Sequence, residues 1–182
     1  MNEDAKDLDA VARCLDDGDL EAFGELVERY QRPIFNVVLH MVKDPEDARE
    51  ISQQVFMSAF EHLPTFSREK RFFSWIYRMA INAAINHLAA RRPLEPLTES
   101  LVANGSTPEG DCAARETSQH LRGAIMSLKP EYRSVVILRH IAQCSYQEVA
   151  EVLGLPEAIV KSRLFTARNQ LRGALVARGY RR

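Results

Sequence analysis

Apolar residues recur every three or four positions through most of this chain, which is the spacing of amphipathic helices. On this pattern we expect helices near residues 8–16, 20–42, 45–63, 72–90, 113–127, 131–142, 145–153 and 157–175. Glycine is scarce, with 8 residues in 182, as suits a chain that is mostly helix. The sequence therefore predicts an all-α fold.

Short motifs mark where helices begin and where the pattern is interrupted. The string DPED at residues 44–47 combines a capping aspartate, a first-turn proline and two acids, and Thr107-Pro108-Glu109 repeats that combination. Residues 93–107, PLEPLTESLVANGST, contain two prolines and a glycine but no apolar stripe, as is typical of a linker. Fully extended, 15 such residues would reach about 50 Å. We therefore expect two small helical domains, residues 1–92 and 111–182, joined by a flexible linker over residues 93–110.

The stretch CSYQEVAEVLGLPEAIVKSRLFTARNQLR, residues 144–172, predicts two helices joined by a tight turn. Ser145 and Glu148 have the spacing of a capping box, in which each side chain accepts a hydrogen bond from a backbone amide at the helix start. Gly154 can adopt the left-handed conformation that ends a helix, and Pro156 suits the start of the next one. The combination is typical of a helix-turn-helix in the C-terminal domain.

The second helix of this pair has two different sides. One side carries the apolar stripe Val160, Leu164, Ala167 and Leu171, and the other carries Lys161, Ser162, Phe165, Arg168 and Arg172. A basic side on the second helix of a helix-turn-helix suits the major groove of DNA. The alternative is an ordinary helical hairpin whose basic side is simply solvated.

The formal net charge of −1 conceals alternating acidic and basic blocks. Residues 1–65 carry 6 basic and 15 acidic residues, a net charge of −9, whereas residues 66–92 carry 6 and 1, a net charge of +5. Residues 93–120 carry −4 and residues 121–182 carry +7. Two separate basic segments indicate two separate contacts with phosphates, while the acidic first block would repel DNA.

Composition narrows the protein class further. The chain is 46% hydrophobic and 27% charged, ordinary values for a globular protein. No apolar run approaches the roughly 20 residues that span a bilayer, and the N-terminal MNEDAKDLDA is too acidic for a signal peptide, so we expect a cytoplasmic protein without direct membrane insertion. Cys14, Cys112 and Cys144 lack metal or disulfide spacing, which favours simple thiols over redox sensing.

The basic block at residues 66–92 is also rich in aromatic side chains. Rings beside cations suit single-stranded nucleic acid, because a ring stacks on a base while the cations hold the backbone. Packing in the core is the competing explanation, since Trp75, Ile76, Met79, Ala80 and Ala83 recur at helical spacing. Asn82 and Asn86 are four residues apart on one helix face, where their amides could read base edges.

Three stretches resemble a known family: YQRPIFNVVLHMVKDPEDAREISQQVFMSAFEHLPTF, then FFSWIYRMAINAAINHL, then SLKPEYRSVVILRHIAQCSYQEVAEVLGLPEAIVKSRLFTAR. They are similar to conserved regions two and four of bacterial extracytoplasmic-function (ECF) RNA polymerase sigma factors. The resemblance covers about residues 20–92 and 118–175. Region three of larger sigma factors has no room in the linker.

The resemblance implies an alternative sigma factor that binds core RNA polymerase and directs promoter-specific transcription initiation. It places the contacts with the upstream, minus-thirty-five element on Lys161, Ser162, Arg163, Phe165 and Arg168. It places the contacts with the minus-ten strand on Phe66, Arg68, Lys70, Arg71, Trp75, Asn82 and Asn86, and those with polymerase on Glu50, Gln53, Gln54 and Phe56. It also implies an anti-sigma factor, often membrane-anchored, as a further partner, and no cofactor.

Other classes of protein fit less well. A free-standing helix-turn-helix regulator would usually dimerise on palindromic DNA, and no dimerisation helix is evident here. An enzyme lacks support, because the five histidines have no metal spacing and no glycine-rich phosphate loop is present. An α-helical adaptor without nucleic acid is a further alternative.

For the free chain, we expect the linker to leave the two domains unaligned with one another.

Overall fold

A computed structural model describes residues 3–91 and 112–177, and the side chains of these residues outside 112–119. The described ranges fold as α1 (Glu3–Asp16), α2 (Leu20–Val42), α3 (Pro45–His62), η1 (Leu63–Thr65, a single 3₁₀ turn), α4 (Phe72–Arg91), α5 (Cys112–Ser127), α6 (Pro130–His140), α7 (Tyr146–Leu153) and α8 (Glu157–Ala177). The all-α prediction is confirmed, and the largest difference is that α1 begins five residues earlier than expected. The predicted linker, with its Thr107-Pro108-Glu109 motif, lies outside the described residues.

The predicted helix ends form through the predicted side chains. Asp44 accepts hydrogen bonds from the backbone amides of Glu46 and Asp47, and so caps α3. At α7 the Glu148 amide donates to the Ser145 hydroxyl at 3.2 Å, and the Ser145 amide donates to the Glu148 carboxylate at 2.8 Å. Gly154 ends α7 with φ of 64°, a left-handed conformation that glycine adopts without strain.

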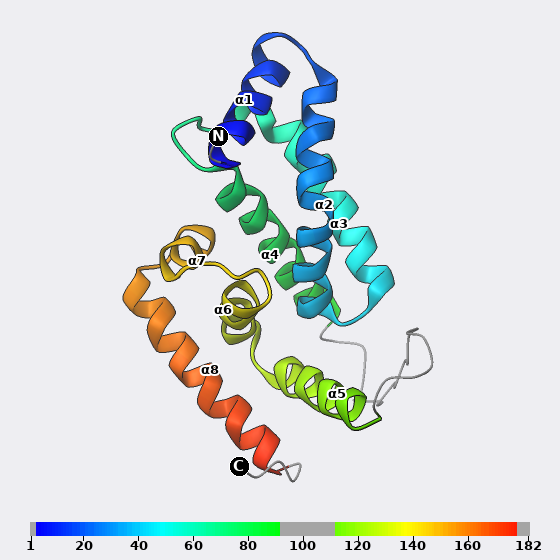
Figure 1. Ribbon diagram of the computed structural model, residues 1–182, viewed down its shortest axis with the longest axis vertical. Coiled ribbons are helices and arrows are strands. Elements are labelled where there is room, and N and C mark those ends of the chain that lie inside the picture. Colours follow the sequence, from blue (N-terminus) through cyan, green and yellow to red (C-terminus); the bar gives the residue numbers. More distant parts are fainter. Residues whose placement is uncertain (1–2, 92–111, 178–182) are drawn as a thin grey trace.

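Helices α1 to α4 pack around one apolar core (Figure 1). Its largest fully buried side chains include Leu26, Ile34 and Met41 from α2 and Phe72 and Ile76 from α4. Burial of such side chains contributes about 1.5–3 kcal/mol each, which holds these helices together despite their acidic surface.

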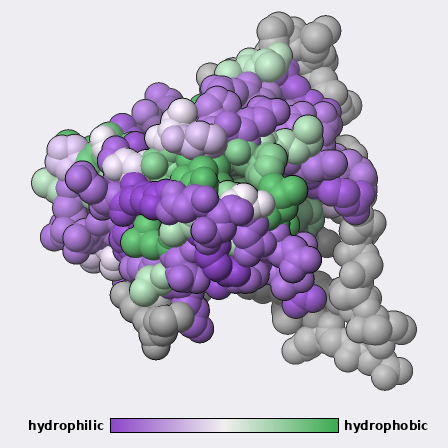
Figure 2. Space-filling model, turned by 90° about the horizontal axis from the view of Figure 1, so that it is seen from above, coloured by the Kyte–Doolittle hydropathy of each residue, from purple (hydrophilic) through white to green (hydrophobic). Residues whose placement is uncertain are grey.

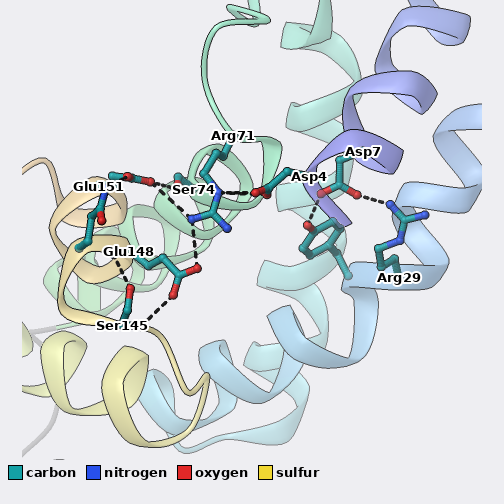
Figure 3. Close-up of polar contacts among 10 residues, drawn as sticks. Asp4, Asp7, Arg29, Arg71, Ser74, Ser145, Glu148 and Glu151 are labelled. Atoms are coloured by element: carbon teal, nitrogen blue, oxygen red, sulfur yellow. Dashed lines mark hydrogen bonds and ion pairs between the residues drawn. The ribbon is translucent and has the colours of Figure 1, made fainter. Parts of the chain in front are cut away.

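A buried acid fastens α1 to this bundle. The Asp7 carboxylate is fully buried and accepts hydrogen bonds from the Arg29 guanidinium and the Tyr30 hydroxyl, both on α2 (Figure 3). Burial and the hydrogen bond to Asp7 raise the pKa of Tyr30. Since a buried carboxylate is tolerated only when paired and hydrogen-bonded, these partners fix where α1 lies.

Of the C-terminal helices, α5, α6 and α7 pack directly on the N-terminal bundle, and α8 packs on these three helices. Helix α6 contacts α2, and the gold α7 of Figure 1 contacts the green α4. Arg133 on α6 is buried and donates to the backbone carbonyls of Met41, at 2.6 Å, and Leu128, at 3.0 Å. The expectation that the linker leaves the domains unaligned is therefore wrong for this structure, because polar and apolar side chains of both domains form a shared interface.

The face of the molecule seen from above is predominantly polar. Viewed from above, hydrophilic side chains surround smaller apolar areas (Figure 2). Within residues 3–91 and 112–177, no helix has the length and apolar character to cross a bilayer.

Candidate nucleic-acid interface

Helix α8 presents a basic side to solvent. Val160, Leu164 and Ala167 are buried, so the expected apolar stripe faces the domain and the opposite side is open. Lys161, Ser162, Phe165 and Arg168 are exposed, and Phe165 is 69% exposed. We call these four residues the recognition face. Arg163 is half-buried and lies beside it in sequence.

Lys161 has local partners that hold its ammonium group. Its Nζ lies 2.6 Å from the Glu157 carboxylate and 5.5 Å from the centre of the Tyr146 ring. The hydrogen bond to Glu157 raises the pKa of Lys161, so the side chain is a cation throughout the physiological range. The pair is exposed and belongs to one helix, so water screens it and it contributes little to stability. A phosphate could therefore replace the Glu157 carboxylate as the partner of Lys161 at little cost in free energy.

On α4, two exposed amides form a second candidate face. Asn82 and Asn86 are both exposed and are one helical turn apart. Trp75, half-buried, lies two turns before Asn82 on the same side, and Lys70 is exposed in the loop that precedes α4. We call Lys70, Trp75, Asn82 and Asn86 the strand face.

The aromatic residues of this block are mainly structural. Phe66 is only 7% exposed, and its ring centre lies 5.9 Å from that of Phe72 and 5.2 Å from that of Trp75. The apolar core takes up the Phe66 ring in this conformation, and its contact with the minus-ten strand stays a prediction. Trp75 keeps part of its surface open.

Two arginines expected to contact DNA are already bound to carboxylates of the same chain. Arg68 donates two hydrogen bonds to Asp16 at the end of α1, and these hydrogen bonds lower the pKa of Asp16. Arg71 donates from Nε to both oxygens of Asp4, at 3.0 Å each, and from Nη1 to Glu148, also at 3.0 Å (Figure 3). In the loop before α4, the charges of Arg68 and Arg71 are therefore paired with carboxylates of α1 and α7.

Two neighbours of Arg71 that no sequence motif singled out, Ser74 and Arg78, also reach α7. The Ser74 hydroxyl donates to the Glu151 carboxylate at 3.0 Å. Arg78 donates from Nε to the carbonyl of Val152 at 3.0 Å and from Nη2 to the carbonyl of Glu151. These carbonyls lie in the last turn of α7, where backbone acceptors lack partners within the helix and carry partial negative charge. Nothing in the sequence pairs Arg78 with a backbone 74 residues away.

A groove between α2 and α3 holds residues of the expected polymerase contact. Its volume is about 520 Å³, and its lining includes Val27, Phe35, Gln53, Phe56 and Met57. Gln53 is exposed and Phe56 is half-buried, while the neighbouring Glu50 and Gln54 are exposed and joined by a hydrogen bond of 3.1 Å. The exposed side chains of Met57 and Phe60 extend this apolar area along α3.

Comparison with known proteins places this arrangement in a family. Residues 26–93 match Sigma-70 region 2, and residues 118–171 match Sigma-70 region 4. The chain is 30% identical over 170 residues to the ECF RNA polymerase sigma factor SigW of Bacillus subtilis, covering 87% of this chain and 91% of that protein. It is 32% identical over 183 residues to the ECF RNA polymerase sigma-E factor of Escherichia coli, covering 94% and 95%.

The chain belongs to the ECF RNA polymerase sigma factors. This sigma factor is also similar to CnrH, solved in complex with the cytosolic domain of CnrY, with a TM-score of 0.74 and 25% identity over 94% of this chain and 98% of that one. The fold is shared with the sigma factor RpoE of Bartonella quintana, solved with the anti-sigma factor NepR, at a TM-score of 0.70 and 18% identity over 86% and 98%. As an alternative sigma factor, the protein directs transcription.

Proposed function

We propose that this sigma factor divides promoter recognition between its two domains. The recognition face of α8 contacts the minus-thirty-five element as duplex DNA, while the strand face of α4 captures the non-template strand of the minus-ten element. The observation that carries this proposal is that the exposed amides of Asn82 and Asn86 and the exposed cations of α8 belong to separate domains. Exposed amides suit unpaired base edges, whereas a basic helix suits a groove.

Core polymerase is the partner proposed for the α2–α3 groove. Phe56 and Met57 offer apolar surface there, and the exposed Gln53 lies beside them. Aromatic and methionine side chains that line a groove are typical of the central part of a protein interface, where most of the binding energy resides. Glu50 and Gln54 would lie at its polar rim. Such a subunit acts in the cytoplasm, where polymerase works.

We further propose two domains bounded by residues 1–92 and 111–182, with residues 93–110 as the connection. CnrH was solved with the cytosolic domain of CnrY, and RpoE of Bartonella quintana with the anti-sigma factor NepR. A cognate anti-sigma factor, either cytosolic or membrane-anchored, is therefore proposed as a third partner beside polymerase and promoter DNA.

The experiment that tests this proposal is reconstitution. Core polymerase is incubated with the full chain and with promoter templates identified by mapping transcripts after overexpression. Transcription that starts at those promoters only when the chain is present supports the proposal. Tight, sequence-specific binding of the chain to promoter duplex without polymerase, and no effect on polymerase, would instead favour a free-standing regulator.

A further inference from the structure

The loop that connects η1 to α4 contains one tight turn. The Lys70 amide donates to the Ser67 carbonyl at 2.9 Å, and residues 67–70 are all exposed. Phe66, directly before the turn, is buried, and its ring centre lies 5.2 Å from that of Trp75 in the strand face. Because Lys70 itself belongs to the strand face, a shift of this turn would move groups that an unpaired strand would meet.

Two carboxylates of α1 hold this turn. Arg68, within the turn, donates from Nη1 to Oδ2 of Asp16 at 2.8 Å and from Nη2 to Oδ1. Arg71, directly after the turn, donates from Nε to both oxygens of Asp4, at 3.0 Å each (Figure 3). The Arg68–Asp16 pair is bidentate, and such pairs fix the orientation of a guanidinium as well as its distance. Since Asp4 and Asp16 lie in the first and last turns of α1, the helix supports the loop at two separate points.

Helix α1 is itself fixed on the bundle by contacts that do not involve the turn. Ala10 and Val11 are fully buried, as is the Asp7 carboxylate that α2 holds. Arg13 donates from Nη2 to both oxygens of Glu25 on α2, at 2.8 and 2.7 Å. Helix α1 is therefore a fixed support for the turn and not a mobile cover over it.

Pairing with α1 suits Arg68 and Arg71 to hold the turn. Their guanidinium groups already donate to carboxylate oxygens, which are the same kind of anionic acceptor as a phosphate oxygen. Glu69 and Lys70 are also exposed in the turn, and their formal charges cancel. The turn as a whole therefore offers little net attraction for a phosphate backbone, so its position matters more than its charge.

We propose that α1 positions this turn through its two carboxylates, and thereby sharpens discrimination between bases of the minus-ten element. Asp16 and Arg68 are then positioning residues, which act on the strand through the turn. The inference rests on the proposed function in one respect, because it takes the strand face as the part that receives the opened strand. It also extends promoter reading to a helix that precedes residues 26–93, the segment that matches Sigma-70 region 2.

Two other roles for the Asp16–Arg68 pair predict different results. If Asp16 only shields Arg68 from phosphates, removal of the carboxylate frees a cation and raises affinity for every strand alike. If Arg68 itself contacts a phosphate, its loss lowers affinity for every strand alike and reduces the salt slope of log affinity by about 0.7. A positioning role instead changes the preference between strands of different sequence.

The test uses the full chain bound to core polymerase, with labelled single-stranded oligonucleotides. One oligonucleotide carries the minus-ten non-template sequence of a mapped promoter, and each of the others carries one substituted base. Fluorescence anisotropy measures the affinity for each, and the ratio of two affinities measures discrimination. The variants are Asp16→Asn, Arg68→Gln and the reversed pair, Asp16→Arg with Arg68→Asp. The matched control is Asp17→Asn, which removes an exposed acid directly after α1.

We expect Asp16→Asn and Arg68→Gln each to lower discrimination about three- to tenfold, which is part of the roughly 5- to 150-fold that one wrong base costs. The reversed pair should recover discrimination, because it restores a bidentate ion pair of opposite polarity. Asp17→Asn should discriminate as the wild type does. The side chains of Asp16 and Arg68 are 54% and 49% exposed, so these substitutions leave the core intact.

Wild-type discrimination in both Asp16→Asn and Arg68→Gln overturns the proposal. An equal gain or an equal loss of affinity for all strands overturns it as well, as does a reversed pair no better than the single variants. A control as defective as Asp16→Asn would show that loss of any nearby charge has the same effect, which also contradicts it. A wild-type holoenzyme that binds all strands alike would refute capture of the minus-ten strand, and this inference with it, whereas the other outcomes leave the proposed function standing.

Discussion

Arg71 donates a 3.0 Å hydrogen bond to Glu148, and so links the loop before α4 to the first turn of the helix-turn-helix. The same carboxylate accepts the Ser145 amide at 2.8 Å, which makes Glu148 both a helix cap and an inter-domain contact. Although burial alone would raise the pKa of Glu148, the hydrogen bonds from Ser145 and Arg71 lower it. The Glu148 side chain therefore caps the start of α7 and also joins α7 to the N-terminal domain.

The contribution of the Ser145 capping box to stability can be tested separately from the contact with Arg71. Ser145→Ala removes the hydroxyl that accepts the Glu148 amide, and should lower the free energy of unfolding by about 1 kcal/mol. The measurement is urea denaturation of the full chain followed by circular dichroism. Ser162→Ala, an exposed serine within α8, is the matched control and should change stability little. An unchanged midpoint for Ser145→Ala would mean that the cap contributes nothing.

Lys161 should contribute one phosphate contact to duplex recognition. Lys161→Ala is expected to weaken binding of the holoenzyme to the upstream element and to reduce the salt slope of log affinity by about 1. Binding is measured at several salt concentrations. Glu157→Gln, which removes the partner of Lys161 but keeps the cation, should leave the slope intact or steepen it. Equal slopes for Lys161→Ala and wild type contradict the contact.

The α2–α3 groove should govern assembly with polymerase. Gln53→Ala combined with Phe56→Ala removes a polar and an aromatic side chain of the groove, and should weaken binding to core enzyme by about tenfold or more. Affinity is measured by fluorescence with labelled chain. Because Phe56 is half-buried, the free energy of unfolding of the variant must be measured as well. A folded variant with wild-type affinity would show that the groove is not the contact.

Cysteine reactivity should differ sharply along the chain. Cys144 is 2% exposed, and burial together with the nearby Glu148 raises its pKa to about 12. A thiolate is formed as pH rises through the pKa, so at pH 8 only about one thiol in ten thousand would be ionised. Cys14 is half-buried, and iodoacetamide should modify it before Cys144, as peptide mass spectrometry can measure. Faster modification of Cys144 in the folded chain would contradict its buried position.

Much of the fold could be predicted because the determining groups are close in sequence. Ser145, Glu148 and Gly154 define α7 within ten residues, and Asp44 with Pro45 starts α3. The early start of α1 could not be predicted in this way. Its first turns are fastened by Asp4 to Arg71 and by Asp7 to Arg29, pairs that only the tertiary structure brings together.

Only part of the candidate site could be predicted from the sequence. The stripe of Val160 and Leu164 correctly indicated which side of α8 is open, since helical periodicity fixes the two sides together. The position of Phe66 could not be predicted in this way, because an aromatic residue beside cations suits both base stacking and a core. In the structure its ring is buried in the core. The hydrogen bonds from Arg78 to carbonyls of α7 could not be predicted from the sequence, because any residue supplies a backbone carbonyl.

The central claim, that α4 captures the opened strand, is tested most directly by promoter melting. Core polymerase with the full chain is bound to a promoter, and permanganate reactivity reports unpaired thymines in the minus-ten element. Asn82→Ala combined with Asn86→Ala should lower this reactivity about tenfold or more, since each good amide–base contact contributes about 1–3 kcal/mol. Co-purification with core enzyme should be unchanged, and Asn36→Ala, an exposed asparagine on α2, should melt DNA normally. Wild-type permanganate reactivity in the Asn82/Asn86 double variant would contradict the account.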